Sequence, residues 1–348
     1  MLLTLTAMIL ATIFAGSVMA KTTYKVAWSH YTGWEPWAQT EQAGTLKKWG
    51  DKYGITIELS PPMDYMESIN LYTAGNYDAC VMTNMDALTV PASGGKDSTV
   101  VIVGDYSDGN DAIVSYSGTS VADLRGRDIF GVELSVSHYL VARALAMNGM
   151  SEADLGAFVN TSDSEIAGLF VANRTPQTTV VTWNPIVMKI RQERGAKVLF
   201  TSAQIPGEIL DLLVVRTDAP EELKKALTGA WYETMAVMSG KGAPTKEALT
   251  FMAKTAGGTL AEFEAQLKTT YMYYTPKAAV EFTASATLAK TMEFVRTFCF
   301  DKGMFGPTAK SKDEVGIELP DGSVMGDKRN VKLRFTTKYM QMAADGKL

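Results

Sequence analysis

Carboxylates and tryptophans gather in the segments that should follow the strands of this chain. These segments are 28–37, 61–66, 82–88, 108–111, 133–138, 183–185 and 206–211, and they contain neither Lys nor Arg. Their acidic and aromatic residues are Glu35, Asp64, Asp86, Asp108, Asp111, Glu133, Glu208, Asp211, Trp28, Tyr31, Trp34, Trp37, Tyr65 and Trp183. An anion site would need Arg or Lys, whereas a small cation can pair with carboxylates and stack on indole rings. These segments therefore predict a site for a small cation.

Some of these polar residues also have a structural interpretation. Asp64 precedes an expected helix at 65–75, and Glu35 lies in the first turn of an expected helix at 36–50, where carboxylates cap backbone N–H groups. Ser137 is expected to cap a helix at 137–148. For any single acid both interpretations stay open, and the absence of basic residues is what favours a cation site.

Short runs rich in Val, Ile and Thr alternate with helical segments up to residue 216. The predicted strands are 23–28, 55–59, 78–82, 100–103, 112–116, 128–132, 157–160, 178–182, 197–200 and 212–216. Helices are expected at 36–50, 65–75, 137–148 and 163–173, and only helices from Pro220 onward, apart from a short strand or helix at 331–335. This order predicts an α/β fold with mostly parallel sheets, in which ligands bind beyond the carboxyl ends of the strands.

Length and composition restrict the class of protein. The 348 residues are 46% hydrophobic and 20% charged, which is typical of a globular chain, and the length suits two domains. A net charge of −5 argues against a nucleic-acid binder. With two cysteines and two histidines we expect no metal site, and Cys80 and Cys299 are interpreted as separate buried thiols, a disulfide being the alternative.

No motif for nucleotide binding, zinc hydrolysis or a serine nucleophile occurs, so we expect neither a cofactor nor an enzyme. Residues 1–20 are uncharged, apolar and end in small residues, which predicts a signal peptide cut before Lys21 and export to the periplasm. A membrane anchor is the alternative interpretation. We expect the chain to cross between two lobes at 108–111 and 206–211, giving one lobe of 21–111 plus 212–348 and a second lobe of 112–211.

Several of these segments also carry a family resemblance. The relevant runs are Tyr24–Trp28, Thr32–Trp37, Tyr77–Ala79, Thr83–Ala87, Asp108–Ala112, Glu133–Leu140, Thr182–Pro185 and Pro206–Ile209. Together they resemble the nitrate/sulfonate/taurine-type substrate-binding proteins of ABC importers over nearly the whole chain after residue 20. Within that family the chain is most similar to the branch whose genes lie beside urea carboxylase, a group linked to urea, short amides and guanidine.

The resemblance implies a type II periplasmic-binding-protein fold, with two α/β lobes, a two-strand hinge and a helical C-terminal region. It implies a monomeric periplasmic receptor for nitrogen uptake that closes over one small solute and docks on a membrane permease. We expect guanidinium as the ligand, with neutral urea or a short amide as the alternative. An enzyme similar to the thiamin-pyrimidine synthases is a further alternative, but the clustered cysteines of those enzymes are missing. The expected ligand-binding residues are Trp28, Trp34, Asp64, Asn84, Asp86, Glu133, Ser135, Ser137, Trp183, Asn184 and Glu208.

Overall fold

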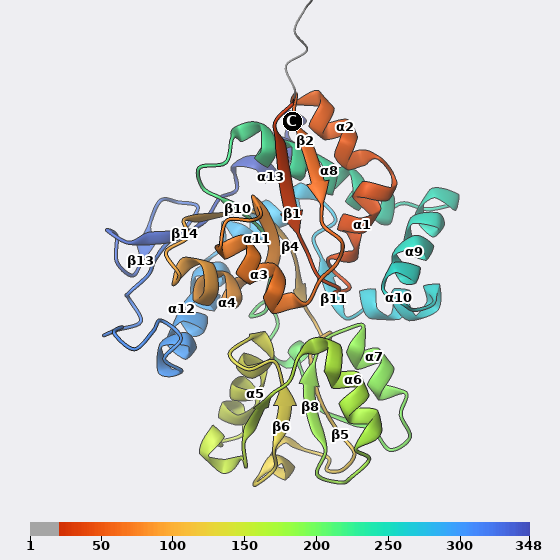
Figure 1. Cartoon of the computed structure of the whole chain (residues 1–348), viewed down its shortest axis with the longest axis vertical. Helices are drawn as coiled ribbons and strands as arrows, with labels where there is room; N and C mark the ends of the chain where they lie inside the picture. Colours follow the sequence, from red (N-terminus) through yellow and green to blue (C-terminus); the bar gives the residue numbers. More distant parts are fainter. Residues whose placement is uncertain (1–20) are drawn as a thin grey trace, which may run out of the picture.

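The computed structural model describes residues 21–348, so the predicted signal peptide at 1–20 lies outside the described residues. No helix within the described range is long and apolar enough to cross a membrane. The described chain folds into two sheets with helices packed around them (Figure 1).

The two sheets take their strands from different parts of the chain. The nine-stranded sheet has the order β13-β12-β14-β4-β10-β3-β1-β2, with β11 added to β4, and the five-stranded sheet has the order β7-β6-β8-β5-β9. The strands are β1 (Thr23–Ala27), β2 (Thr56–Leu59), β3 (Ala79–Thr83), β4 (Ser98–Ser107), β5 (Ala112–Ser115), β6 (Ile129–Gly131), β7 (Phe158–Asn160), β8 (Thr179–Thr182), β9 (Lys197–Thr201), β10 (Leu210–Arg216), β11 (Thr270–Met272), β12 (Gly316–Glu318), β13 (Val324–Met325) and β14 (Val331–Phe335).

Thirteen α-helices of the described chain surround these sheets. They are α1 (Glu35–Gln42), α2 (Thr45–Lys52), α3 (Tyr65–Thr73), α4 (Asn84–Ala87), α5 (Val136–Met147), α6 (Asp163–Ala172), α7 (Ile186–Arg191), α8 (Glu221–Met238), α9 (Ala243–Thr255), α10 (Leu260–Leu267), α11 (Pro276–Thr283), α12 (Ala286–Asp301) and α13 (Lys338–Ala344). Helices α5, α6 and α7 lie with the five-stranded sheet, in the lower part of Figure 1.

Burial explains why the strands were visible in the sequence. Every residue of β3 is buried, and nine of the ten residues of β4 are buried. A strand covered on both faces has no polar side to alternate with its apolar side, so its sequence is a continuous run of residues such as Val, Ile and Met.

The chain passes between the sheets twice, after β4 and after β9. The two crossings touch, because the hydroxyls of Ser107 and Ser202 lie 2.7 Å apart and the backbone N–H of Gly109 donates to Ser202 Oγ at 2.8 Å. Gly109 has φ = 115°, a conformation that only glycine adopts readily. The two connections are therefore held side by side at the junction of the sheets.

The structure confirms an α/β fold, and each of the ten predicted strands lies within a few residues of its expected position. The sheets are more mixed than predicted, because β10 runs antiparallel to β3 and β4, and β5 runs antiparallel to β8 and β9. Each of these strands follows a crossing between the sheets, which reverses its direction.

Three local predictions were wrong. The expected helix at 36–50 is broken into α1 and α2, because Gly44 takes φ = 70° between them. Helix α5 is capped by Ser135, whose hydroxyl accepts from the N–H of Ser137, so Ser137 lies in the first turn. The region after Pro220, expected to be otherwise helical, also holds the strands β11, β12 and β13.

Other local predictions were confirmed. Of the two alternatives for 331–335, a strand or a helix, the structure shows the strand β14. Cys80 and Cys299 are free and buried, as predicted.

Candidate functional site

A narrow cavity lies beside the two crossings, and its walls come from both groups of elements. It is lined by Tyr31, Trp34, Tyr65, Thr83, Asp111, Val136, Trp183, Ile209 and Asp211, which enclose about 250 Å³ including the space at its mouth. As it stands, the space admits about one water molecule. Pockets for drug-sized ligands measure about 300–1,000 Å³, so this cavity suits a solute of only a few non-hydrogen atoms.

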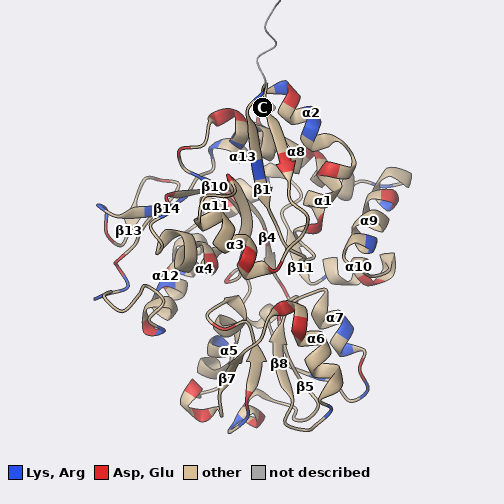
Figure 2. Cartoon of the chain, viewed as in Figure 1, with Lys and Arg blue, Asp and Glu red and all other residues tan. Residues whose placement is uncertain are grey.

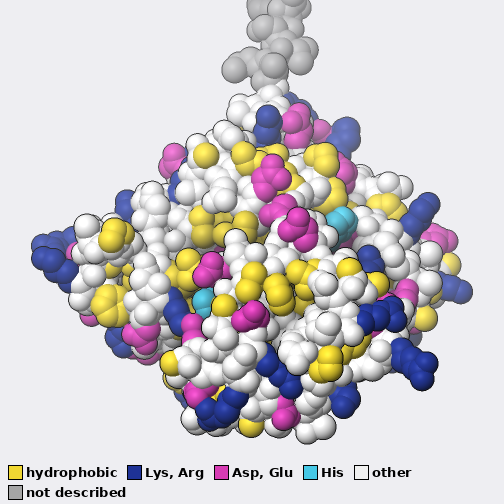
Figure 3. Space-filling model, turned by 60° about the horizontal axis from the view of Figure 1, so that its bottom comes forward, with side chains coloured by type: hydrophobic (Ala, Val, Ile, Leu, Met, Phe, Trp, Pro, Cys, Tyr) yellow, Lys and Arg dark blue, Asp and Glu magenta, His cyan; other side chains and the backbone are white. Residues whose placement is uncertain are grey.

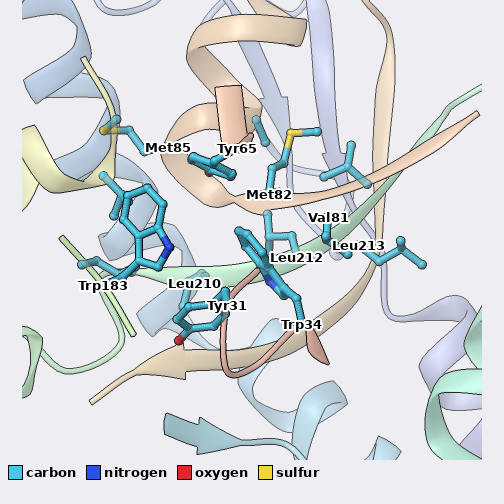
Figure 4. Close-up of a cluster of buried hydrophobic side chains, with 14 of the residues drawn as sticks. Tyr31, Trp34, Tyr65, Val81, Met82, Met85, Trp183, Leu210, Leu212 and Leu213 are labelled. Carbon is cyan, nitrogen blue, oxygen red and sulfur yellow. The ribbon is translucent and has the colours of Figure 1, made fainter. Parts of the chain in front are cut away.

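Four aromatic side chains form much of the wall (Figure 4). The ring centroid of Trp34 lies 5.0 Å from that of Tyr31 and 5.5 Å from that of Tyr65, with the Tyr65 ring stacked on the indole. Tyr65 in turn meets Trp183 edge-on at 5.5 Å. Rings in contact at these distances hold one another in place, so the wall has little freedom to collapse into the cavity.

Four aspartates lie in or next to the cavity with at most 3% of their surface exposed: Asp86, Asp105, Asp111 and Asp211. Asp105 and Asp211 are direct partners in the register of β4 and β10, which brings the two side chains together. In residues 21–348 none of the four forms an ion pair. The Lys and Arg side chains that form ion pairs do so with other carboxylates. A buried carboxylate without a cationic partner is costly.

That cost raises the pKa of each aspartate. Burial is the largest cause throughout, and it raises the pKa of Asp86 to about 6 and the pKa values of Asp105 and Asp111 to about 7. The pKa of Asp211 is raised well above its usual value, by burial first and then by the charge of Asp105 and a hydrogen bond between the two carboxyl groups. The pair Asp105–Asp211 therefore holds a proton near neutral pH.

Apart from the contact between the carboxyl groups of Asp105 and Asp211, several buried polar atoms around the cavity have no hydrogen-bond partner among the described residues. They include Asp86 Oδ1, Asp105 Oδ2, Asp211 Oδ2 and Trp34 Nε1. Leaving a buried polar atom unsatisfied costs about 1–3 kcal/mol. Three of the four atoms are carboxylate oxygens, so a ligand that donates N–H groups would satisfy most of them.

Asp86 is fixed from two sides. The hydroxyls of Tyr65 and Thr83 both donate to its Oδ2, the latter at 2.7 Å. The backbone N–H of Val136, at the start of α5, also lowers the pKa of this carboxyl group, against the larger effect of burial. Asp86 belongs to the nine-stranded side and α5 to the five-stranded side, so the carboxyl group links the two.

Further acids lie on the rim, where α3 and α6 present acidic segments on opposite sides of the junction (Figure 2). Ser162 Oγ donates to Asp64 Oδ2 at 2.8 Å across this junction. Burial and the neighbouring charge of Asp64 raise the pKa of Asp163 to about 7. The face turned forward in Figure 3 carries acidic, basic and hydrophobic side chains together. Asp64 and Asp163 thus add two acids to the junction near the cavity.

Within residues 21–348, no group of three or more His, Cys, Asp or Glu side chains is arranged to hold a metal ion. The aspartates instead lie in different parts of the cavity wall or behind it, next to aromatic rings. Such a set of acceptors can receive several N–H donors that point in different directions from a small planar cation.

Comparison with known proteins shows the family. The family model described as the periplasmic substrate-binding protein of phosphonate ABC transporters matches residues 39–251, more than half of the chain. The chain belongs to this family. It is therefore a periplasmic substrate-binding component of an ABC transporter, as the motifs indicated, and its family is one of solute-binding proteins. Comparison with curated proteins gave no match.

Solved structures agree in fold. The alkanesulfonate-binding protein of Xanthomonas axonopodis pv. citri, bound to MOPS, is 14% identical with a TM-score of 0.65, covering 82% of this chain and 95% of that one. The aliphatic sulphonate-binding protein of Escherichia coli is 15% identical with a TM-score of 0.65, covering 81% and 94%. A Candida albicans protein with the generic periplasmic binding protein fold is 15% identical with a TM-score of 0.59, covering 79% and 89%. At this identity the likeness shows the fold.

Among the eleven predicted ligand-binding residues of this substrate-binding protein, the structure brings three to the cavity. Trp34 and Trp183 line it, and Asp86 lies directly behind Tyr65 and Thr83. The serines Ser135 and Ser137 flank Val136 at the same end of α5. Ser135 is used as the helix cap, whereas Ser137 Oγ is buried without a partner.

Other predicted residues have structural partners outside the cavity lining. Trp28 Nε1 donates to the carbonyl of Ser60 at 2.8 Å. The amide of Asn84 binds the backbone at Glu208 and Leu210, and the amide of Asn184 binds Asn110 and the N–H of Met188. Asp64 caps α3 by accepting from two backbone N–H groups.

The two predicted glutamates do not line the cavity. Glu133 is exposed on the surface. Glu208 is held by Arg143, whose Nε and Nη2 lie 2.7 and 2.8 Å from its two oxygens, and by the hydroxyl of Tyr139. Its charge is therefore already balanced by Arg143, which lies on α5 beyond the end of the acidic segment 133–138.

Several residues that line the cavity were not among the eleven predicted ligand-binding residues. Tyr31, Tyr65, Asp111 and Asp211 were all among the acids and aromatics of the predicted loops. Asp105, which lies next to the cavity, was not among them, because β4 was predicted to end at Val103 and in fact continues to Ser107. Its signal in the sequence is a lone acid two residues beyond a continuous apolar run.

Proposed function

We propose that this substrate-binding protein captures a small nitrogen-rich cation, with guanidinium as the representative ligand. By this proposal it serves nitrogen uptake, like the branch of the family whose genes lie beside urea carboxylase. The observation that carries the proposal is the group of four buried aspartates beside a tryptophan-lined cavity with no basic residue in its lining. A bound cation would supply the positive charge that these carboxylates lack.

The geometry favours a planar cation with several N–H groups. Asp111 and Asp211 both line the cavity, and a guanidinium group can donate paired hydrogen bonds to carboxylates. Trp34 and Trp183 offer rings against which such a cation can stack. A sulfonate or phosphonate would instead need donors to its oxygens, and the three hydroxyls of this lining, those of Tyr31, Tyr65 and Thr83, already donate to aspartates.

Binding is proposed to proceed by closure of two lobes about the crossings. The lobes comprise 21–111 with 212–348 and 112–211, and the cavity walls come from both, with Tyr65 and Thr83 on one side and Val136 and Trp183 on the other. Because the cavity admits about one water as described, a ligand must enter while the lobes are further apart.

Neutral urea is the second candidate, and the raised pKa values of Asp105, Asp111 and Asp211 favour it. Protonated carboxyl groups could accept N–H donors and donate to a carbonyl without any ionised partner. The two candidates differ in proton release. A cation lowers the pKa of a neighbouring carboxyl group, so guanidinium should expel protons on binding and urea should not.

Isothermal titration calorimetry tests this difference. We expect guanidinium to bind the purified protein at pH 7, with an apparent enthalpy that differs between two buffers of unlike ionisation enthalpy. Asp211→Asn should weaken binding by about 2–5 kcal/mol, as loss of a buried charge pair does. The control Glu133→Gln, at an exposed acid, should stay within about threefold of wild type. Tighter binding of urea, taurine or methylphosphonate than of guanidinium would refute the cation proposal.

A further inference from the structure

A second compartment adjoins the cavity and shares two of its walls, Trp34 and Asp211. It encloses about 190 Å³, and its other walls include Trp37, Trp231, Gly104 and Asp105. Like the cavity itself, it admits about one water molecule as it stands. A ligand held by Asp211 in the cavity therefore lies next to an extra space of about one non-hydrogen atom.

The compartment is apolar apart from a few unsatisfied polar atoms. Among the described residues, Trp231 Nε1 has no acceptor, and Asp105 Oδ2 has no donor other than the neighbouring carboxyl group of Asp211, although both residues are buried. The indole of Trp231 is held by Trp37, whose ring centroid lies 5.1 Å away. Trp231 therefore has an unpaired donor, Asp105 has an oxygen that can accept a further donor, and both residues line the same small space.

Two glycines leave room for side chains of this compartment, and one of them, Gly104, is itself part of its wall. A Cβ atom on Gly33 would lie 2.3 Å from Asp105 Oδ2, and one on Gly104 would lie 3.1 Å from Cζ2 of Trp231. A larger residue at position 33 would displace the carboxyl group. The backbone therefore leaves room for both Asp105 and Trp231 where they stand.

We propose that the second compartment receives a polar substituent of the bound cation, about the size of one water, that donates to Asp105 and accepts from Trp231. This inference rests on the proposed function and narrows its substrate class to guanidinium compounds that carry such a group, as an N-amino group does. An N-methyl group has the same size, but it can neither donate to the carboxyl group nor accept from the indole. Sites built around a hydrogen bond reject analogues that lack it far more strongly than apolar pockets reject analogues differing by one methylene.

Calorimetry with guanidinium, aminoguanidinium and N-methylguanidinium tests the proposal on the wild-type protein. We expect aminoguanidinium to bind at least as tightly as guanidinium and about tenfold or more tighter than N-methylguanidinium, because the methyl compound leaves two buried polar atoms unpaired. In Trp231→Phe, which keeps an aromatic ring but removes the N–H, this preference should fall at least threefold while guanidinium itself changes less than threefold. Trp49→Phe, at an indole that donates to Glu233 on another part of the molecule, is the matched control.

Each contrary result has a distinct meaning. If N-methylguanidinium binds as tightly as aminoguanidinium, the polar role of the compartment is refuted. If guanidinium binds but both analogues lose more than tenfold, the compartment does not admit a substituent, and the proposed function stands without this inference. If none of the three compounds binds, the proposed function itself is refuted, and the inference with it.

Discussion

Replacing Asp111 by Asn should stabilise the protein at alkaline pH while impairing the site. Asp111 is buried in the cavity wall, and burial is the main reason that its pKa rises from 3.8 to about 7. The charge of Asp86 raises it further, and a hydrogen bond with Ser107 partly opposes the shift. A carboxyl group of this kind is tolerated in the folded state mainly in its neutral form.

The sign and size follow from proton linkage. Because the folded-state pKa of Asp111 lies above its unfolded value, its contribution to stability is fully present below pH 3.8 and is lost as the pH rises through about 7. Between pH 5 and pH 8 the loss spans about two pH units, at 1.36 kcal/mol for each unit, or about 3 kcal/mol. The amide of Asp111→Asn does not titrate, so the variant should escape this loss.

Urea unfolding at pH 5 and pH 8 measures the effect. The difference in the free energy of unfolding, variant minus wild type, should increase by about 3 kcal/mol between the two pH values. Asp123→Asn is the control with opposite sign, because hydrogen bonds from the backbone of Thr119 and Ser120 lower the pKa of that exposed carboxyl group. Its difference should become no more favourable at pH 8.

A difference for Asp111→Asn that stays constant or decreases towards pH 8 would refute the reasoning. It would mean that the ionised form of Asp111 is stabilised within the folded protein. The acidic cavity would then need no external cation, and the argument for a cationic ligand would lose its energetic basis.

Two further predictions concern the walls of the cavity. Trp34→Ala and Trp183→Ala should each weaken guanidinium binding at least tenfold. Binding to the wild-type protein should also change its tryptophan fluorescence. Unchanged affinity in both variants would mean that these rings serve only in packing. Small-angle scattering should give a smaller radius of gyration with saturating guanidinium than without ligand, because the lobes must open for entry; equal radii would contradict closure.

The sequence was informative wherever a feature depends on local pattern. Continuous apolar runs marked the strands, and Asp64 marked the start of α3. The acidic and aromatic character of the loops also carried over to the cavity, since Tyr31, Tyr65, Asp111 and Asp211 all come from them.

The selection among those loop residues needed information that the sequence does not contain. Asp105 meets Asp211 only through the register of β4 and β10, which are about a hundred residues apart. Glu133 follows a strand as predicted, but the direction of its side chain depends on the turn before α5, where Leu134 takes φ = 55°. Glu208 is neutralised by Arg143 from a helix interior, a pairing that only tertiary packing creates.

The position of β10 has a consequence for the order of folding. This strand lies between β3 and β4 in the nine-stranded sheet, although more than a hundred residues separate it from either in the sequence. The five-stranded sheet, in contrast, is complete once residue 201 has been made, because all its strands lie between 112 and 201. Its contacts are more local, so it pays less loop-closure entropy and should form first. The aspartates of β4 and β10 can then meet only late, after the inserted sheet has brought the ends of these two strands together.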